Sequence, residues 1–168
     1  LVGVIGGSGL YQMDALTDAQ ELVVDTPFGA PSDVLVTGQV HGVPVVFVAR
    51  HARGHRLLPS EVPYRANLYA LKKLGVRYVL SVSAVGSLRE DFAPGDFVLV
   101  DQFIDRSTRR PPSFFGPGLV AHVSLADPTC PRLGALVVQA AREAGLTLHS
   151  GATYLSMEGP QFSTRAES

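Results

Sequence analysis

The feature that most limits the possible folds is a series of short apolar runs that are rich in β-branched residues. Runs of this kind are typical of β-strands, and several of them lack polar alternation, which indicates strands that are buried on both faces. We expect strands over residues 2–5, 21–25, 33–39, 44–50, 78–83, 96–101 and 148–157. Two segments with helical periodicity lie among these runs, and they predict helices over residues 61–74 and 132–144.

Strands that alternate with helices predict an α/β fold, in which helices cover both faces of a central β-sheet. The 168 residues suit one domain, so we predict that residues 1–168 form a single domain. A hydrophobic fraction of 46% is ample for a packed core. The formal net charge of −1 provides no general attraction to nucleic acids or to anionic membranes, and we expect neither as a partner.

Two further observations concern the setting of the protein. Cys130 is the single cysteine, so no disulfide bond can form within the chain, and this fits a cytoplasmic location. The longest apolar run, residues 43–49, is far too short to span a bilayer. Near the last residue, Thr164 and Glu167 have the spacing of a capping box, which starts a helix. We therefore expect an incomplete protein that lacks a substantial C-terminal part.

The segments that directly follow the strands are the first place to look for a binding site. In α/β sheets, ligands bind beyond the carboxyl ends of the strands. Four segments of this kind contain glycine, small or polar residues: 6–9, 50–55, 83–87 and 158–163. We expect these four segments to meet at one edge of the sheet.

The glycine-rich segment after the first strand suits a small oxyanion. A dinucleotide-binding fingerprint would need a third glycine where Gln12 stands, and a P-loop would need a lysine that is not there. What remains is a short loop in which the hydroxyl of Ser8 is flanked by accessible backbone N–H groups, which can surround an anion. A tight turn without a ligand explains the same glycines equally well.

Arg50 and His51 follow the next strand candidate immediately. Arginine offers a planar fork that matches two phosphate oxygens, and histidine can donate one further hydrogen bond. Arg53 and Arg56 lie further along and are interpreted as a solvated basic turn.

Ser83 and Ala84 end the following strand, and their small size lets the backbone approach an anion. A close-packed turn is an equally good interpretation of this pair. In the fourth segment, Phe162 is either a core residue or a stacking platform for a flat ring. Glu158 binds either backbone amides or sugar hydroxyls.

Taken together, seven stretches of the chain resemble the trimeric purine nucleoside phosphorylase family. They are GGSGL, DTPFGAPSD, ARHARGH, the NLYAL helix, AVGSLRE, PGDFVLVDQFIDRSTRRPPSFF and MEGPQFSTRAES. The resemblance runs from Gly3 to Ser168 and is greatest to the members that act on 5′-methylthioadenosine. It implies a mixed central sheet and a pentosyl transfer in purine and methionine salvage. The expected reaction is phosphorolysis of 5′-methylthioadenosine to adenine and 5-methylthioribose 1-phosphate, with inorganic phosphate as co-substrate and with neither a cofactor nor a metal.

The resemblance also implies roles for individual residues. The residues that would surround the phosphate are Ser8, Arg50, His51, Ser83 and Ala84. Family members usually carry threonine at the positions of Ser8 and Ser83, and serine keeps the hydroxyl. Phe162 would lie against the adenine with Ser163 beside it, and His122 would reach into the neighbouring subunit's pocket in a homotrimer.

Members of the family continue with a methionine–threonine pair and an aspartate that hydrogen-bonds the purine. Neither can be placed before Ser168, so no catalytic residue is assigned and we expect these 168 residues alone to be inactive.

Three alternatives stay open. The first is phosphorolysis of 6-oxopurine nucleosides or of methylthioinosine, although relatives with that preference tend to carry glutamate where Ser163 stands. The second is a non-catalytic, nucleoside-binding fragment. The third concerns Ser163 alone, which would merely cap the helix that begins at Thr164. A nucleotide-binding dehydrogenase is disfavoured by Gln12.

Overall fold

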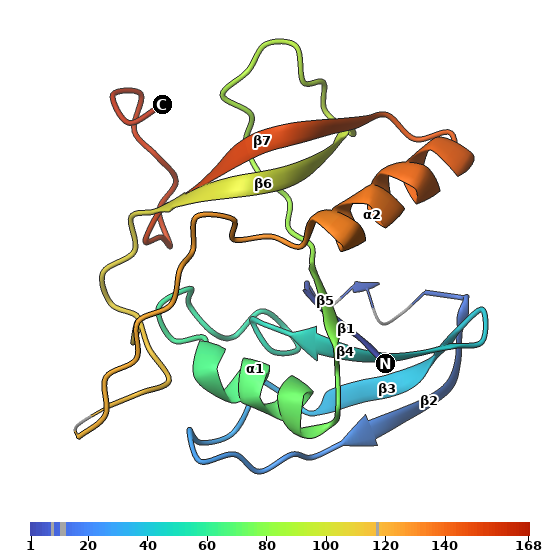
Figure 1. The fold of residues 1–168 in the computed structure, drawn as a ribbon, viewed down its shortest axis with the longest axis vertical. Coiled ribbons are helices and arrows are strands. Elements are labelled where there is room, and N and C mark those ends of the chain that lie inside the picture. Colours follow the sequence, from blue (N-terminus) through green and yellow to red (C-terminus); the bar gives the residue numbers. More distant parts are fainter. Residues whose placement is uncertain (8, 11–12, 117) are drawn as a thin grey trace. The chain divides into compact units, whose positions relative to one another are not determined.

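In a computed structural model, the chain forms two compact units, residues 1–84 and 85–168 (Figure 1). The structure describes residues 1–7, 9–10, 13–116 and 118–168. Ser8 and Gln12, which the sequence analysis singled out, lie outside the described residues. The assignment of the whole chain to a single domain stays a prediction.

The first unit is built on a mixed, five-stranded sheet with the strand order β2-β3-β4-β1-β5. Its strands are β1 (Val2–Gly6), β2 (Leu16–Leu22), β3 (Leu35–Val40), β4 (Val43–Ala49) and β5 (Tyr78–Ser81). Strand β1 pairs in parallel with β4 on one side and with β5 on the other. The pairs β2–β3 and β3–β4 are antiparallel. The carboxyl ends of β1, β4 and β5 therefore share one edge of the sheet.

The core of this unit lies on both faces of β4. Val46 and Val48 pack on one face with Ala70 and Leu71 of helix α1 (Tyr64–Lys73). Phe47 and Val45 pack on the opposite face, in a cluster with Val36 of β3. Figure 1 shows α1 lying along the sheet. The lack of polar alternation in β4 is thus explained, as predicted, by burial of both of its faces.

Helix α1 begins three residues later than the sequence pattern predicts. Pro63 occupies the N-cap position, and the helix starts at Tyr64. Glu61, which was expected in the first turn, instead accepts a hydrogen bond from the Leu58 backbone N–H at 2.9 Å. The helix ends where it was expected to end, because Gly75 adopts a φ of 81° that favours glycine.

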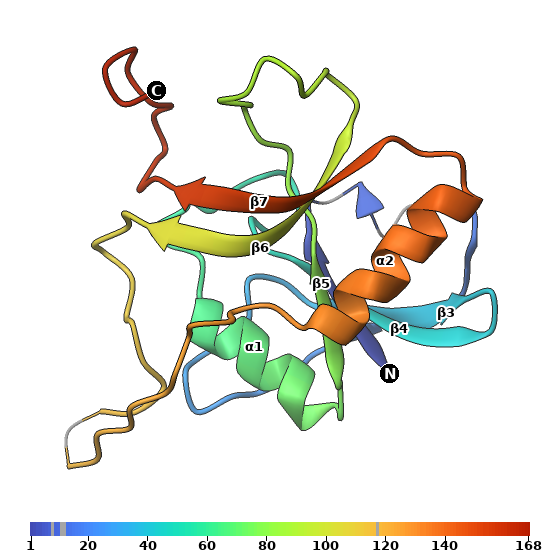
Figure 2. The same ribbon diagram turned by 45° about the horizontal axis from the view of Figure 1, so that its top comes forward.

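The second unit contains a two-stranded parallel sheet and one described helix. Strands β6 (Phe97–Asp105) and β7 (Leu148–Ser156) pair over their whole length, from Phe97 with Leu148 to Asp105 with Ser156. Helix α2 (Pro131–Glu143) connects them and packs on this pair (Figure 2). Gly134 lies against Leu99, since a Cβ placed on this glycine would be 3.5 Å from Leu99 Cδ2.

The predicted α/β fold is confirmed, and one strand prediction is wrong. A strand was expected over residues 21–25, but β2 runs from Leu16 to Leu22. The polar sequence of β2 gave no strand signal because β2 is the edge strand and exposes most of its side chains. The apolar residues 23 and 24 follow the point where β2 stops pairing with β3, at Leu22 and Leu35.

No helix in the described part of the chain is long and apolar enough to cross a membrane.

Candidate functional site

The described structure joins three of the four predicted segments at one edge of the five-stranded sheet. The backbone N–H of Arg50 donates to the carbonyl of Gly6 at 3.2 Å, which ties the end of β4 to the end of β1. The Val82 N–H donates to the Ile5 carbonyl at 2.8 Å and ties the end of β5 to β1 in the same way. The parallel pairing of β1 with both neighbours therefore places the segments after Gly6, Ala49 and Ser81 side by side.

The side chain of Arg50 lies along this edge. Its Nη1 donates to the carbonyl oxygen of Val82 at 3.0 Å, so the guanidinium extends from the end of β4 towards the end of β5. Ser83 and Ala84 follow directly and are exposed. A guanidinium carries several N–H donors in a fork, and the bond to Val82 orients that fork. The edge thus presents a fixed positive charge next to two small residues.

The ring of His51 is held in one orientation. Its Nδ1 lies 2.9 Å from the carbonyl oxygen of Leu57, and because a carbonyl only accepts, Nδ1 carries the proton. The ring also stacks on His55, with the centroids 4.4 Å apart and an angle of 18° between the planes. The proton on Nδ1 leaves Nε2 as the second polar atom of the ring, and Nε2 donates when the imidazole is protonated.

Gly6 shows why the first loop needs glycine. A Cβ at this position would collide with Leu10 and would lie 3.3 Å from the carbonyl oxygen of Val82. The same test at Gly7 and Gly9 meets nothing within 4 Å. A side chain at Gly6 would therefore have to displace Leu10 and would press on the Val82 carbonyl, whereas Gly7 and Gly9 leave open space.

The fourth predicted segment follows β7 and belongs to the second unit. Glu158 accepts hydrogen bonds from the backbone N–H groups of Thr108 and Arg109 and from the Thr108 hydroxyl, with the last two at 3.1 Å. These bonds, first of all the one from the Thr108 N–H, hold the pKa of Glu158 below its ordinary value. Of the two interpretations of Glu158, binding to backbone amides is thus confirmed. The residue ties the loop after β6 to the loop after β7.

Phe162 and Ser163 follow Glu158 along the chain. Phe162 is 95% exposed, so it is not a core residue of this unit. The Ser163 hydroxyl lies 2.6 Å from that of Ser168. The predicted helix at this end is a single turn, in which Glu167 accepts from the Thr164 N–H at 2.6 Å as in a capping box. This bond also lowers the pKa of Glu167. The group that accepts from the Thr164 N–H is therefore Glu167.

His122 is exposed and lies in the long connection between β6 and α2. Gln102 Nε2 of β6 donates to the carbonyl of Ala126 in this connection at 2.9 Å. The described structure thus brings Arg50 and His51 together with Ser83 and Ala84 in the first unit. Phe162, Ser163 and His122 belong to the second unit.

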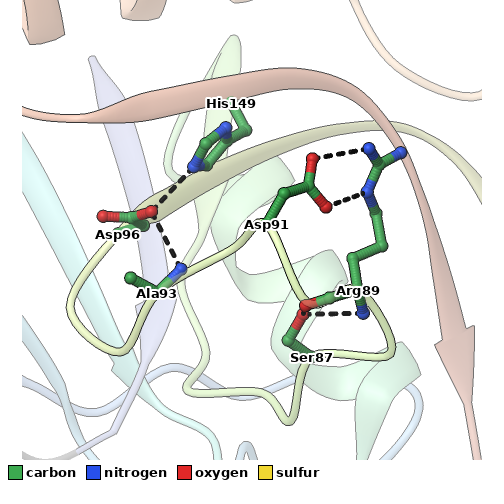
Figure 3. Close-up of polar contacts among 6 residues, drawn as sticks. All are labelled: Ser87, Arg89, Asp91, Ala93, Asp96 and His149. Carbon is green, nitrogen blue, oxygen red and sulfur yellow. Dashed lines mark hydrogen bonds and ion pairs between the residues drawn. The ribbon is translucent and has the colours of Figure 1, made fainter.

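The sequence analysis missed a cluster of polar and aromatic side chains. They lie on the loop that connects β5 to β6 along the chain and on β7 (Figure 3). His149 Nε2 lies 2.7 Å from Asp96 Oδ2, and its ring stacks on Phe92 at 4.2 Å between centroids. The guanidinium of Arg89 covers Phe92 and forms two bonds, at 2.9 and 2.7 Å, with Asp91. The bond with His149 lowers the pKa of Asp96.

This cluster fastens the loop over residues 87–96 to β7. The groups in Figure 3 bind one another and the backbone of the same loop, as in the bond from the Ala93 N–H to Asp96 at 3.1 Å. The described residues also contain no group of three or more histidine, cysteine or acidic side chains that could hold a metal ion. We therefore interpret the cluster as a structural contact that holds this loop on β7. No local sequence pattern indicates it, because His149 and Asp96 are far apart along the chain.

Comparison with known proteins places the chain in a family. Residues 1–168 match the model of the phosphorylase superfamily. The chain belongs to this superfamily. The S-methyl-5'-thioadenosine phosphorylase of Cereibacter sphaeroides is 63% identical over 168 residues, which are 100% of this chain and 58% of that protein. The protein of the same name from Geobacter sulfurreducens is 61% identical over 169 residues, with 100% and 59% covered.

Solved structures of other superfamily members show the same fold. A crystal structure of methylthioadenosine phosphorylase from an antarctic soil metagenomic library is 56% identical, with a TM-score of 0.95, 99% of this chain covered and 59% of that one. Methylthioadenosine phosphorylase from Schistosoma mansoni in complex with adenine is 40% identical, with a TM-score of 0.92 and coverages of 99% and 68%. The resemblance and the fold predicted from the sequence are confirmed. The chain spans about three fifths of the length of the curated relatives, at 58% and 59%.

Proposed function

We propose that this phosphorylase superfamily member acts on 5′-methylthioadenosine, which it converts with inorganic phosphate into adenine and 5-methylthioribose 1-phosphate. The observation that carries the proposal is the edge where β1, β4 and β5 end, with the Arg50 guanidinium bonded to the Val82 carbonyl. An oriented guanidinium beside a fixed imidazole and small residues suits a compact, doubly charged anion. The names of the relatives support the choice of nucleoside.

The phosphate is assigned to the first unit. Arg50 binds two phosphate oxygens with the donors that face away from Val82, and Nε2 of the protonated His51 imidazole donates a further bond. The backbone N–H groups of Ser83 and Ala84 and the Ser8 hydroxyl complete the set. Bonds of this kind between charged groups are roughly twice as strong as neutral hydrogen bonds. They fix the phosphate in a position from which one oxygen can attack.

The reaction follows from this placement. A phosphate oxygen forms a bond to C1′ of the sugar while the bond from C1′ to the purine nitrogen breaks, and the electron pair leaves with the purine. The sugar acquires oxocarbenium character in the transition state, as in glycoside cleavage. The phosphate dianion stabilises this positive charge, and the protein contributes mainly by alignment. The proton that the purine takes up is assigned to an aspartate in the part of the relatives that follows the matched region.

The base is assigned to the second unit. Phe162 presents a ring that is 95% exposed and can stack on adenine. Ser163 is short and neutral, so it does not repel the lone pair on N1 of adenine as a carboxylate would. His122 is assigned to the 5′ pocket of a neighbouring subunit, and we propose a homotrimer on that basis. The single cysteine supports a cytoplasmic location.

The test uses an extended protein, defined as this chain continued after Ser168 with the rest of the Cereibacter sphaeroides relative. Purified extended protein is supplied with 5′-methylthioadenosine in buffers with and without inorganic phosphate, and adenine is quantified. We expect adenine and a sugar phosphate in the first buffer and no adenine in the second.

Two results would contradict the proposal. Release of adenine at equal rates in both buffers would indicate hydrolysis. Binding of 5′-methylthioadenosine and phosphate without turnover, while the unmodified relative is active, would indicate a nucleoside-binding protein that is not an enzyme. The 168-residue chain, assayed in parallel, is expected to be inactive.

A further inference from the structure

The turn that carries His51 is bonded to a carboxylate from another part of the first unit. The Arg53 backbone N–H donates to Asp33 Oδ2 at 2.7 Å. Asp33 lies just before β3 and is half-buried. We propose that Asp33 is a positioning residue of the phosphate site, which holds the turn after β4 so that Arg50 and His51 face the anion. This inference rests on the assignment of phosphate to these two residues.

The turn has a conformation that needs support from outside. Ala52 and His55 have positive φ angles of 60° and 54°, which residues other than glycine adopt at a cost. Such conformations persist where the surrounding structure holds them in place. Ala52 is 4% exposed, so the turn is packed against the unit at the residue that follows His51.

Most of the hydrogen bonds around the turn run within it. The Ala52 N–H donates to the Ala49 carbonyl at 2.9 Å, and the Arg56 and Leu57 N–H groups donate to the His51 carbonyl at 2.9 and 3.2 Å. The N–H of Arg53 points the other way, to Asp33. The bond to Asp33 therefore helps to fix the position of the turn, whereas the internal bonds set only its shape.

Asp33 is itself held firmly. Its other carboxylate oxygen, Oδ1, accepts from the Val34 N–H at 2.8 Å. The preceding residue, Ser32, forms two hydrogen bonds with Asn67 of α1: the Ser32 N–H donates to Asn67 Oδ1, and Asn67 Nδ2 donates to the Ser32 hydroxyl oxygen, both at 2.8 Å. Asn67 is 2% exposed, and polar groups buried this deeply are retained where they are fully bonded. A chain of short bonds thus runs from α1 through residues 32 and 33 to the turn.

The charge of Asp33 argues that its role is geometric. A carboxylate near an anion site repels the anion, so Asp33 does not serve phosphate binding through its charge. Its contribution comes from two acceptor oxygens that bind two N–H groups at once. An amide side chain of the same size would keep one carbonyl oxygen and replace the other with a donor.

The test measures the affinity of the extended protein for inorganic phosphate by isothermal titration. The variants are Asp33→Ala and Asp33→Asn, with far-UV circular dichroism as the check on folding. The control is Glu21→Gln, which removes the ion pair of Glu21 with the Arg53 side chain at 2.7 Å and leaves the Arg53 N–H untouched. We expect Asp33→Ala to weaken phosphate binding about tenfold, Asp33→Asn to weaken it less, and Glu21→Gln to leave it unchanged.

A second measurement separates positioning from general destabilisation. Asp33→Ala is repeated in the His51→Ala background, where a residue that acts partly through His51 has a smaller effect on phosphate affinity. An effect of equal size in both backgrounds would overturn the proposal, as would unchanged or tighter phosphate binding in the single variants. If both Asp33 variants unfold, Asp33 serves stability alone and the proposal fails. Absence of phosphate binding by the unsubstituted extended protein would instead contradict the proposed function.

Discussion

The two units of this chain differ sharply in how they bury apolar side chains. Of the buried hydrophobic residues in the described part of the chain, all but Ala141 belong to the first unit. In the second unit, Phe97, Phe103 and Ile104 of β6 are 49%, 47% and 54% exposed. The first unit therefore has a core of its own beneath the strand ends that carry Arg50 and His51. In the second unit, polar contacts of His149 with Asp96 and of Glu158 with Thr108 add to the pairing of β6 with β7.

This difference also separates the residues that we propose for phosphate from those that we propose for the base. A phosphate is small and fully charged, so its site benefits from groups held rigidly by a packed sheet. The base-binding residues assigned here, Phe162 and Ser163, instead lie on an exposed segment after β7. Extensive exposed apolar surface, as on β6, marks a face that other protein covers or that promotes aggregation. The extended protein is expected to cover such surface, and the isolated chain to aggregate more readily.

The largest expected effect is on the stability of the first core. Leu71→Ala removes a side chain of α1 that is 2% exposed, and truncation of a buried leucine costs about 2–5 kcal/mol. Leu136→Ala in α2, at a position that is 56% exposed, is the matched control and should cost at most about 0.5 kcal/mol. The free energy of unfolding from urea titration checks both values. Equal losses at the two positions would break the contrast between the units.

The next effect concerns the phosphate site. Arg50→Ala in the extended protein should raise the KM for phosphate by about 10- to 150-fold, because a hydrogen bond to a charged group contributes roughly 1.5–3 kcal/mol. The KM for 5′-methylthioadenosine should change little, since the base is assigned to the second unit. Steady-state kinetics with each substrate varied in turn measures both constants. An unaltered phosphate dependence would place Arg50 outside the site.

A substitution in the second unit should have the opposite selectivity. Ser163→Glu introduces a carboxylate that repels N1 of adenine but accepts from the N1–H of an oxopurine. A mispaired polar group costs on the order of 1–3 kcal/mol, so the ratio of kcat/KM for 5′-methylthioadenosine to that for inosine should fall by about tenfold or more. The phosphate KM serves as the internal control. A changed melting temperature with an unchanged ratio would remove the residue-level support for adenine.

Acid should affect the second unit more than the first. The pKa values of Asp96 and Glu158 are held below their ordinary values, by the bond with His149 and by the bond from the Thr108 N–H respectively. Stability from a lowered carboxyl pKa is present above the ordinary value and is lost as the pH falls through the lowered one. Amide hydrogen exchange from pH 6 to acid pH should show β7 opening before β4. Asp96→Asn should make the opening of β7 less dependent on pH, and earlier exchange in β4 would reverse the comparison.

The smallest effect is expected at an exposed ion pair of the first unit. Arg53 and Glu21 lie 2.7 Å apart, but their side chains are 42% and 59% exposed. Exposed pairs contribute about 0–1 kcal/mol, so Glu21→Gln should shift the free energy of unfolding by no more than this. Urea titrations at low and high salt measure the shift. A larger loss of unfolding free energy that persists at high salt would show that this ion pair also supports the turn.

The sequence was informative wherever a signal was local. The helix ends at Gly75 and Gly145, the buried strand at residues 44–49 and the residues that follow it could all be predicted, because each depends on neighbours along the chain. Strand β2 was misplaced because an edge strand can be polar. The links of Asp33 to Arg53 and of Glu158 to Thr108 left no local signal, since each joins residues far apart in the sequence.

The sequence by itself determined the family and the side chains that stand at the ends of the strands. Only the tertiary structure decided which of these ends come together. Strand β1 lies between β4 and β5 in parallel, so the segments after these three strands share an edge, whereas β7 pairs with β6 in a separate sheet. Strand pairing depends on contacts between distant segments, and the apolar pattern of one strand does not specify its partner. Arg50 meets Val82 because β1 brings their strands together.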